Sequence, residues 1–121
     1  MIVATDAPLE YRQLHRLAVR ATAGISRTGS VYGHGSGDEV IAFSTAYSID
    51  WKSDSALRAP VAFLNDTALD PEFFEATADA TEQAILKAIY SVQTLTGFQG
   101  KTVKSFVDAW EEKFGRFDDD P

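Results

Sequence analysis

The sequence contains no cysteine and only two histidines. Without cysteine the chain can form no disulfide, hold no metal through thiolates and use no cysteine as a nucleophile. His15 and His34 fall in different expected elements, and no third ligand stands at a spacing typical of zinc sites. The composition therefore argues against a metalloenzyme, and no metal or other cofactor is expected.

Basic residues are also in deficit: 11 lysines and arginines stand against 18 aspartates and glutamates, for a formal net charge of −7. Proteins that neutralise a nucleic-acid backbone need a basic face, so no nucleic-acid partner is expected. No apolar run approaches membrane-spanning length, and the apolar start "MIV" is too short for a secretory signal. The chain as given is expected to be soluble with no membrane partner, and its compartment, cytoplasmic or periplasmic, stays open.

Apolar side chains are plentiful, at 45% of the 121 residues. That share is typical of globular proteins, and the length fits one domain. No internal repeat, low-complexity segment or shift in composition marks a second domain. We therefore expect a single domain over 1–121, with an acidic, solvated tail over 116–121 that ends in "FDDDP".

The first half of the chain predicts a strand, a helix and a second strand. The apolar run "MIVAT" precedes a helix over 6–25, with Asp6 as the expected N-cap and Gly24 or Gly29 as the expected end. β-branched and aromatic residues predict a strand within 39–49, and the segment 50–69 is expected to be irregular. Pro8 lies in the first turn of the helix, and its apolar stripe consists of Leu14, Leu17, Ala18, Ala21 and Ile25.

The second half predicts two helices. Asp70 is the expected N-cap and Pro71 the first helical position of a helix that runs to Gly97. A shorter amphipathic helix follows and ends at Gly115. The apolar stripe of the longer helix is Phe74, Ala78, Thr81, Ile85, Ala88 and Val92, and that of the shorter one is Val103, Phe106, Val107, Trp110 and Phe114.

This order of elements supplies two strands at most, and two strands alone make a sheet of marginal stability. The apolar stripes also exceed what so short a chain can cover by itself. Exposed apolar patches of that extent mark interfaces. We therefore expect a second polypeptide to complete the sheet.

The stretch "GHGSGD" at 33–38 places three glycines within five residues. It fits either a plain turn or a site that needs close backbone approach, and the hexapeptide alone favours the turn. A classical serine-hydrolase triad fits poorly, because "GHGSG" does not have the nucleophile-elbow spacing. His34 is expected in an exposed turn, and His15 on the surface of a helix or partly buried there.

Three blocks of sequence, taken together, point to a family. They are "ATDAPLEYRQLHRLAVRA" at 4–21, "RTGSVYGHGSGDEVIAFSTAY" at 27–47 and "ATEQAILKAIYSVQTLTG" at 80–97. In this order they resemble the β subunit of the L-aminopeptidase/D-esterase family, which includes the β-peptidyl aminopeptidases. The segment 51–70 and the last twenty or so residues match less clearly.

The resemblance implies an α/β fold, a layered α-β-β-α sandwich similar to N-terminal-nucleophile hydrolases and ornithine acetyltransferase, with its sheet completed by a partner α chain. It implies a precursor that cuts itself into α and β chains, which associate further as several αβ pairs. The serine at the new β N-terminus, expected just before Met1, attacks the substrate. Such enzymes release small L-, D- or β-aminoacyl groups from peptides, amides or esters.

The resemblance also implies catalytic roles for Ser36 and Asp38, because the matching family positions contact the terminal serine. The α-amine of such a serine, with an ordinary pKa of about 7.7–8.0, can take the hydroxyl proton itself. We expect Ser36 to bridge the nucleophile and the amine by hydrogen bonding, and Asp38 to orient the amine and stabilise its ammonium form. The glycines are expected to let the backbone pass close to the nucleophile, and the α chain to supply the oxyanion donors.

Two other functions stay open. The chain fits a non-catalytic interaction module of the same fold, which a start at Met1 without the serine favours and the intact "GHGSGD" opposes. It also fits an acyl transferase related to ornithine acetyltransferase, although the nucleophile of that relative is a threonine.

Overall fold

The computed structural model describes residues 1–48, 51–52, 56, 62–69 and 71–116. The chain divides into two units, Met1–Glu82 and Gln83–Pro121, and helix α2 runs from the first into the second. The expected cap Asp70 and the end of the acidic tail, 117–121, lie outside the described residues. That the whole chain acts as one domain stays a prediction.

Helix α1 (Tyr11–Arg27) begins later than the sequence suggested. Its N-cap is Glu10, not Asp6, because Glu10 and Gln13 form a capping box in which each side chain accepts from the other's backbone N–H. The helix runs through Gly24 to Arg27. Gly29 follows with φ 95°, so the later of the two predicted ends is the correct one.

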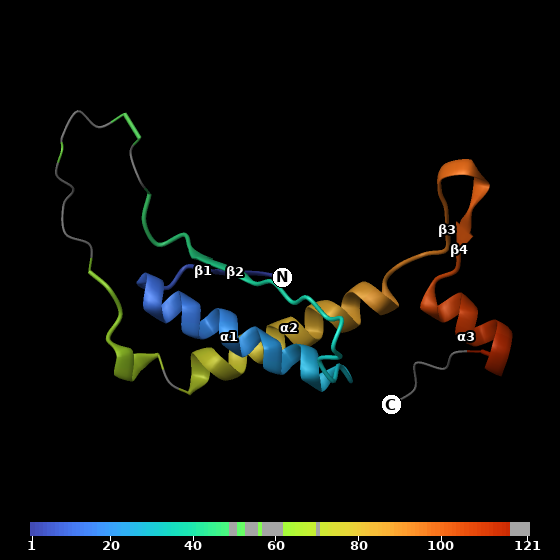
Figure 1. Cartoon of the computed structure of the whole chain (residues 1–121), viewed down its shortest axis with the longest axis horizontal. Helices are drawn as coiled ribbons and strands as arrows, with labels where there is room; N and C mark the ends of the chain where they lie inside the picture. The colour runs from blue at the N-terminus through green and yellow to red at the C-terminus, as the bar shows by residue number, and fades with distance from the viewer. Residues whose placement is uncertain (49–50, 53–55, 57–61, 70, 117–121) are drawn as a thin grey trace. The chain divides into compact units, whose positions relative to one another are not determined.

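Strands β1 (Ile2–Thr5) and β2 (Ile41–Ser44) form a parallel pair that lies along α1 (Figure 1). Ile2 lies opposite Ile41, and the register continues to Thr5 opposite Ser44. Strand β2 is shorter than the predicted 39–49 segment, since pairing stops where β1 stops. A parallel pair needs a crossover between its strands, and α1 provides it.

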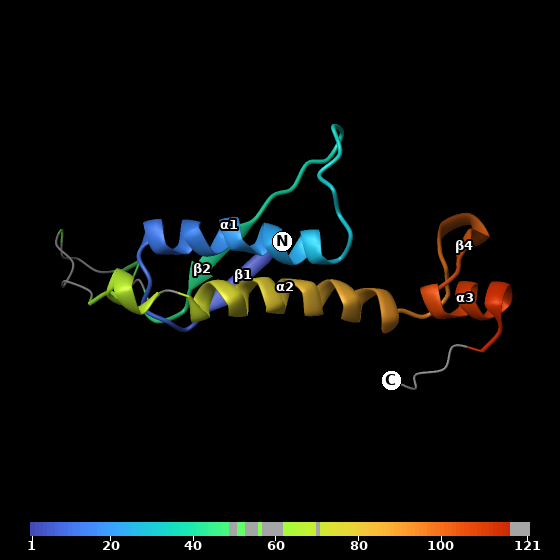
Figure 2. The ribbon, with the colours of Figure 1, turned by 90° about the horizontal axis from the view of Figure 1, so that it is seen from below.

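Helix α2 (Glu72–Tyr90) runs beside α1 in the first unit (Figure 2). Pro71 immediately precedes it, close to the predicted start. The two helices approach most closely at Gly24, where an added Cβ would stand 2.4 Å from the Ala78 carbonyl oxygen and 2.6 Å from the Thr81 Cβ. The core beneath them centres on Leu9, Leu17 and Leu69, with Ala7, Leu14, Leu64, Phe73 and Phe74 packed around it.

Arginines on α1 reinforce this helix pair from the surface. Arg27 forms ion pairs with Asp79 and Glu82 of α2. The guanidinium carbons of Arg16 and Arg20 lie 4.8 and 4.5 Å from the centre of the Phe74 ring.

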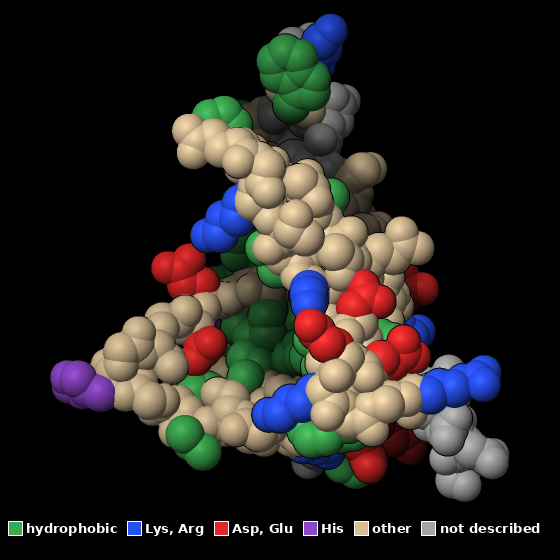
Figure 3. Space-filling view, turned by 90° about the vertical axis from the view of Figure 1, so that its right-hand side faces the viewer, with side chains coloured by type: hydrophobic (Ala, Val, Ile, Leu, Met, Phe, Trp, Pro, Cys, Tyr) green, Lys and Arg blue, Asp and Glu red, His purple; other side chains and the backbone are tan. Residues whose placement is uncertain are grey.

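Side chains of both charge signs are interspersed on the face drawn in Figure 3. In the described part of the chain, no helix is long and apolar enough to cross a membrane.

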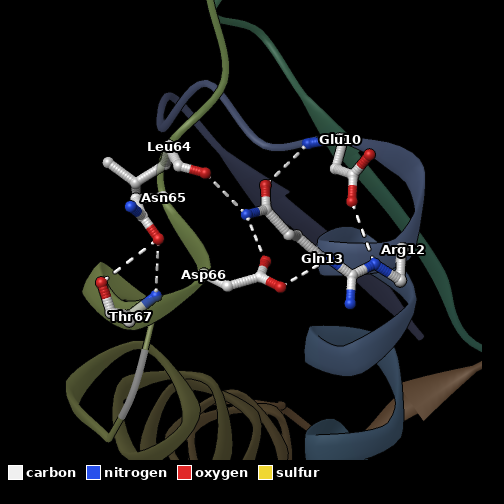
Figure 4. A network of polar contacts seen from close by, with 7 residues as sticks. All are labelled: Glu10, Arg12, Gln13, Leu64, Asn65, Asp66 and Thr67. Carbon is white, nitrogen blue, oxygen red and sulfur yellow. Dashed lines mark hydrogen bonds and ion pairs between the residues drawn. The ribbon is translucent and has the colours of Figure 1, made fainter.

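A polar network joins the start of α1 to the 3-10 turn η1 (Asp66–Ala68), which falls in the predicted irregular segment (Figure 4). The buried Gln13 side chain donates to the Leu64 carbonyl at 2.7 Å and to Asp66 Oδ1 at 2.9 Å. Arg12 donates to the other Asp66 carboxylate oxygen at 2.5 Å. The hydrogen bond from Gln13, followed by that from Arg12, holds the pKa of Asp66 below its ordinary value of 3.8.

This network predicts a pH-dependent contribution to stability. Because the folded pKa of Asp66 is lowered, its contribution is present above the unfolded value and is lost as pH falls through the folded pKa. In urea unfolding of the complete protein, the stability gap between wild type and Asp66→Asn should shrink as pH drops from about 6 to about 2.5. Asp6→Asn, which removes an exposed carboxylate, is the control. A gap that stays constant across this range would refute the assignment.

The second unit contains a hairpin that the sequence analysis missed. Helix α2 ends at Tyr90 rather than at Gly97, so Val92 lies outside the helix. Strand β3 (Leu95–Thr96) pairs antiparallel with β4 (Thr102–Val103), and the chain turns back at Gln99 and Gly100, with φ 58° and 73°. The prediction of at most two strands was wrong, as was the placement of Val103 on a helix.

Helix α3 (Phe106–Phe114) follows the hairpin, and the buried Ser105 caps it by accepting from the Asp108 backbone N–H at 3.0 Å. The predicted stop at Gly115 is confirmed, with φ 92°. Three aromatic rings of the predicted stripe contact one another in sequence: Phe106 and Trp110 are tilted to each other with 5.9 Å between ring centres, and Trp110 and Phe114 are tilted with 4.6 Å. Tyr90, at the end of α2, meets Phe106 edge-on at 5.3 Å.

Candidate functional site

Residues 30–40, which we call the site loop, connect α1 to β2 and contain "GHGSGD". The end of α1 directs the chain into this loop, because the backbone N–H groups of Thr28 and Gly29 donate to Ile25 and Ser26, each at 3.0 Å. Gly29 then adopts a left-handed conformation that a side chain would oppose. These backbone contacts therefore set the direction in which the loop leaves the end of α1.

A turn lies at the centre of the site loop. The Ser36 N–H donates to the Gly33 carbonyl at 2.8 Å, with His34 and Gly35 between them, so the predicted turn is confirmed. The three glycines of the turn region lack positive φ, and an added Cβ would meet no described atom within 4 Å. Within the described residues, neither conformation nor a neighbour requires glycine at Gly33, Gly35 or Gly37.

The structure places Ser36 and Asp38 at the exposed end of this turn, two positions apart along the chain. Within the described residues neither side chain forms a hydrogen bond or an ion pair, and the turn is closed by backbone atoms alone. The two side chains therefore make no contribution to closing the turn. Both are open to solvent and to any group that approaches the loop.

The two histidines occupy the surroundings expected for them. His34 is exposed in the turn, and His15 is exposed on α1. The His15 ring stacks on Tyr11, with 6.4 Å between ring centres.

The start of β1 is held against the end of the site loop. The Met1 nitrogen donates to the Glu39 carbonyl at 2.6 Å, and the Ile41 N–H donates to the Met1 carbonyl at 3.0 Å. The backbone that enters β1 therefore runs directly beside the residues that follow Asp38. The start of the chain therefore lies beside the end of the site loop.

Sequence reasoning did not single out Tyr32. It adopts φ 49°, which is unusual for a residue other than glycine, and its phenol donates to the Thr22 carbonyl of α1. The Ser26 hydroxyl lies 3.2 Å from both the phenol oxygen and the Thr22 carbonyl oxygen, and the two share its one proton. An aromatic residue just before a glycine turn was the one available signal, and nothing in the sequence indicated the contact with the helix.

The sequence pattern of peptidase family S58 matches residues 1–103, which include the site loop and both strands beside it. The chain belongs to peptidase family S58. Among curated relatives, the β-peptidyl aminopeptidase BapA of Sphingosinicella microcystinivorans is 39% identical over 104 residues, which are 86% of this chain and 26% of that protein. This S58 chain thus spans about a quarter of that relative's length.

Solved structures similar to this S58 chain are also longer proteins. The PH0078 protein of Pyrococcus horikoshii OT3 is 35% identical, with a TM-score of 0.74 over 96% of this chain and 33% of its own. The L-aminopeptidase D-Ala-esterase/amidase of Ochrobactrum anthropi is 34% identical, with a TM-score of 0.73 over 97% of this chain and 34% of its own. The latter is described as a prototype serine aminopeptidase and a variant of the N-terminal-nucleophile hydrolase fold. The α/β class predicted for this chain agrees with these neighbours.

Proposed function

We propose that this chain is the β part of a self-processed serine aminopeptidase that hydrolyses N-terminal aminoacyl peptides, amides or esters. The nucleophile is a serine that lies just before Met1 in the complete protein and becomes the N-terminus of the β chain on processing. Ser36 and Asp38 assist it from the site loop. Membership of family S58 and similarity to the O. anthropi serine aminopeptidase support this reaction class.

The observation that carries the proposal is the parallel register of β1 and β2. Ile2 lies opposite Ile41, and the Met1 nitrogen donates to the Glu39 carbonyl at 2.6 Å. Extending this register backward from Met1 sets the preceding residues of the complete protein alongside the segment 36–38. A serine just before Met1 then has both proposed site residues beside it.

The chemistry follows from what such a serine offers. Its hydroxyl is a weak nucleophile unless a base removes the proton, and its own α-amine, with an ordinary pKa of about 7.7–8.0, is such a base near neutral pH. The Ser36 hydroxyl can accept and donate at once, so it bridges the nucleophile and the amine. A negative charge on Asp38 stabilises the ammonium that forms after proton transfer.

The outer face of the strand pair is apolar and exposed, which supports the proposal of a partner chain. Ile2, Ile41 and Phe43 are 72%, 65% and 43% exposed, and they alternate with inward residues of both strands. An apolar sheet face of this kind must be covered to be stable in water. We propose that the α chain of the same precursor covers it with a second sheet, which makes the α-β-β-α sandwich, and that αβ pairs associate further.

Two alternatives remain candidates at a lower rank. A non-catalytic interaction module of the same fold needs the partner-facing sheet but no nucleophile. An acyl transferase needs the same constellation and an acceptor amine in place of water.

The test uses the complete protein and aminoacyl p-nitroanilides, with and without an added acceptor amine. The proposal predicts release of p-nitroaniline that does not depend on the acceptor. Turnover that requires the acceptor would support the transferase, and no turnover with any small aminoacyl group would support the module.

A further inference from the structure

Within the described residues, Tyr32 makes the side-chain hydrogen bonds that attach the site loop to the body of the fold. The phenol donates to the Thr22 carbonyl and accepts from the Ser26 hydroxyl at 3.2 Å. Both partners lie on the last two turns of α1. The phenol is thus bound as donor and acceptor to one rigid element.

The backbone conformation of Tyr32 supports a role for this attachment in directing the loop. Tyr32 adopts φ 49°, in the left-handed region that bulky residues avoid. A conformation of this kind persists only where surrounding contacts hold it, and such positions cluster at functional sites. Here the Tyr32 side chain is hydrogen-bonded to α1, while its backbone continues into the turn at Gly33–Ser36.

The position of Tyr32 gives the contact a consequence for Ser36 and Asp38. Tyr32 immediately precedes the turn whose closing hydrogen bond runs from the Ser36 N–H to the Gly33 carbonyl at 2.8 Å. The phenol holds the chain just before the turn, and the Met1–Glu39 hydrogen bond at 2.6 Å holds the chain just after Asp38. The glycines between these two points provide little resistance to displacement.

We propose that Tyr32 is the positioning residue of the site loop: its phenol, bound to the end of α1, fixes where Ser36 and Asp38 stand. This inference rests on the function proposed above, because it assigns Tyr32 a role in that same site. Tyr32 itself does not contact the reacting atoms. Its effect passes through the turn to the residues that do.

The test is kinetic and uses the complete protein. Tyr32→Phe keeps the ring and removes both hydrogen bonds. Because small displacements of reacting groups are costly, kcat on an aminoacyl p-nitroanilide should fall by about 10- to 100-fold, with KM within about twofold and an unchanged melting temperature. Tyr11→Phe is the matched control: Tyr11 is 85% exposed, and its phenol makes no hydrogen bond in the described structure.

A double-mutant cycle separates positioning from a local stability effect. Ser26→Ala removes the second partner of the phenol and should lower kcat by a smaller factor. Because the Ser26 hydroxyl acts on the loop through the phenol, Ser26→Ala added to Tyr32→Phe should cause no further loss. A wild-type kcat for Tyr32→Phe, or fully additive losses in the double variant, would overturn the inference.

Ser36→Ala, measured in parallel, distinguishes failure of this inference from failure of the proposed function. If Ser36→Ala abolishes turnover while Tyr32→Phe does not affect it, the positioning role alone is wrong. If Ser36→Ala retains full turnover, the proposed site is wrong and the role of Tyr32 is overturned with it.

Discussion

Replacing either Ser36 or Asp38 with alanine is expected to lower kcat of the complete protein by about 100-fold or more, the scale measured for removing one preorganised polar group from an active site. Both side chains are exposed and make no hydrogen bond or ion pair in the described structure. Their removal therefore costs little folding energy, and the melting temperature should stay close to that of the wild type. Steady-state kinetics with an aminoacyl p-nitroanilide, combined with thermal unfolding, measures both quantities.

His34→Ala is the matched control, because His34 lies in the same turn and is equally open to solvent. It should change kcat by no more than a few-fold, because the proposed base is the α-amine of the nucleophile. The opposite pattern, with His34→Ala inactive and Ser36→Ala unaffected, would replace the proposed mechanism with one in which histidine is the base.

Among Gly→Ala substitutions in this chain, Gly24→Ala is expected to cause the largest loss of stability. The new Cβ would stand 2.4 Å from the Ala78 carbonyl oxygen and 2.6 Å from the Thr81 Cβ, so α1 and α2 would have to move apart. Overpacking of this kind costs about 3 kcal/mol. It outweighs the gain of about 1 kcal/mol that alanine normally gives over glycine within a helix.

Gly37→Ala is the control for this substitution, because its added Cβ meets no described atom within 4 Å and its φ is not positive. It should leave the free energy of unfolding unchanged or slightly raised. Urea unfolding of both variants measures the difference. If Gly24→Ala were as stable as wild type, the close approach of the two helices would not exist in the protein.

Local sequence signals were better at predicting that an element forms than at predicting where it begins or ends. Pro71 and Gly115 act through their own backbone constraints, so the start of α2 and the end of α3 were located to within a residue or so. Asp6 looked like a cap, but the reciprocal Glu10–Gln13 pair provides more hydrogen bonds and moves the start of α1. A cap that depends on two side chains is easily missed when residues are judged singly.

The hairpin was missed because an apolar repeat was continued too far. Val92 fits the helical spacing of the stripe, yet α2 ends at Tyr90. Beyond it, the Thr94 hydroxyl accepts from the Ser105 N–H at 2.9 Å and donates to Asp108, which ties the segment after α2 to the start of α3. Contacts between residues this far apart in the chain override local periodicity.

The residues of the candidate site could not be predicted from local sequence signals in the way that the helices could. Ser36 and Asp38 came from resemblance to a family, and their catalytic roles stay predictions. The parallel register that brings the start of β1 beside Glu39 depends on the crossover through α1, which no local motif encodes. The role of Tyr32 could not be predicted either, because its hydrogen-bond partners lie on the preceding helix and no local motif indicates them.

The central claim is that this chain is the β part of a self-cleaved serine aminopeptidase, and intact mass spectrometry of the complete protein, purified after expression, tests it most directly. The account predicts two polypeptides, the smaller beginning with a serine just before Met1, and their replacement by a single uncut chain when that serine is changed to alanine. A single mature polypeptide in the active wild-type protein, or a smaller chain that begins with a residue other than serine, would contradict it.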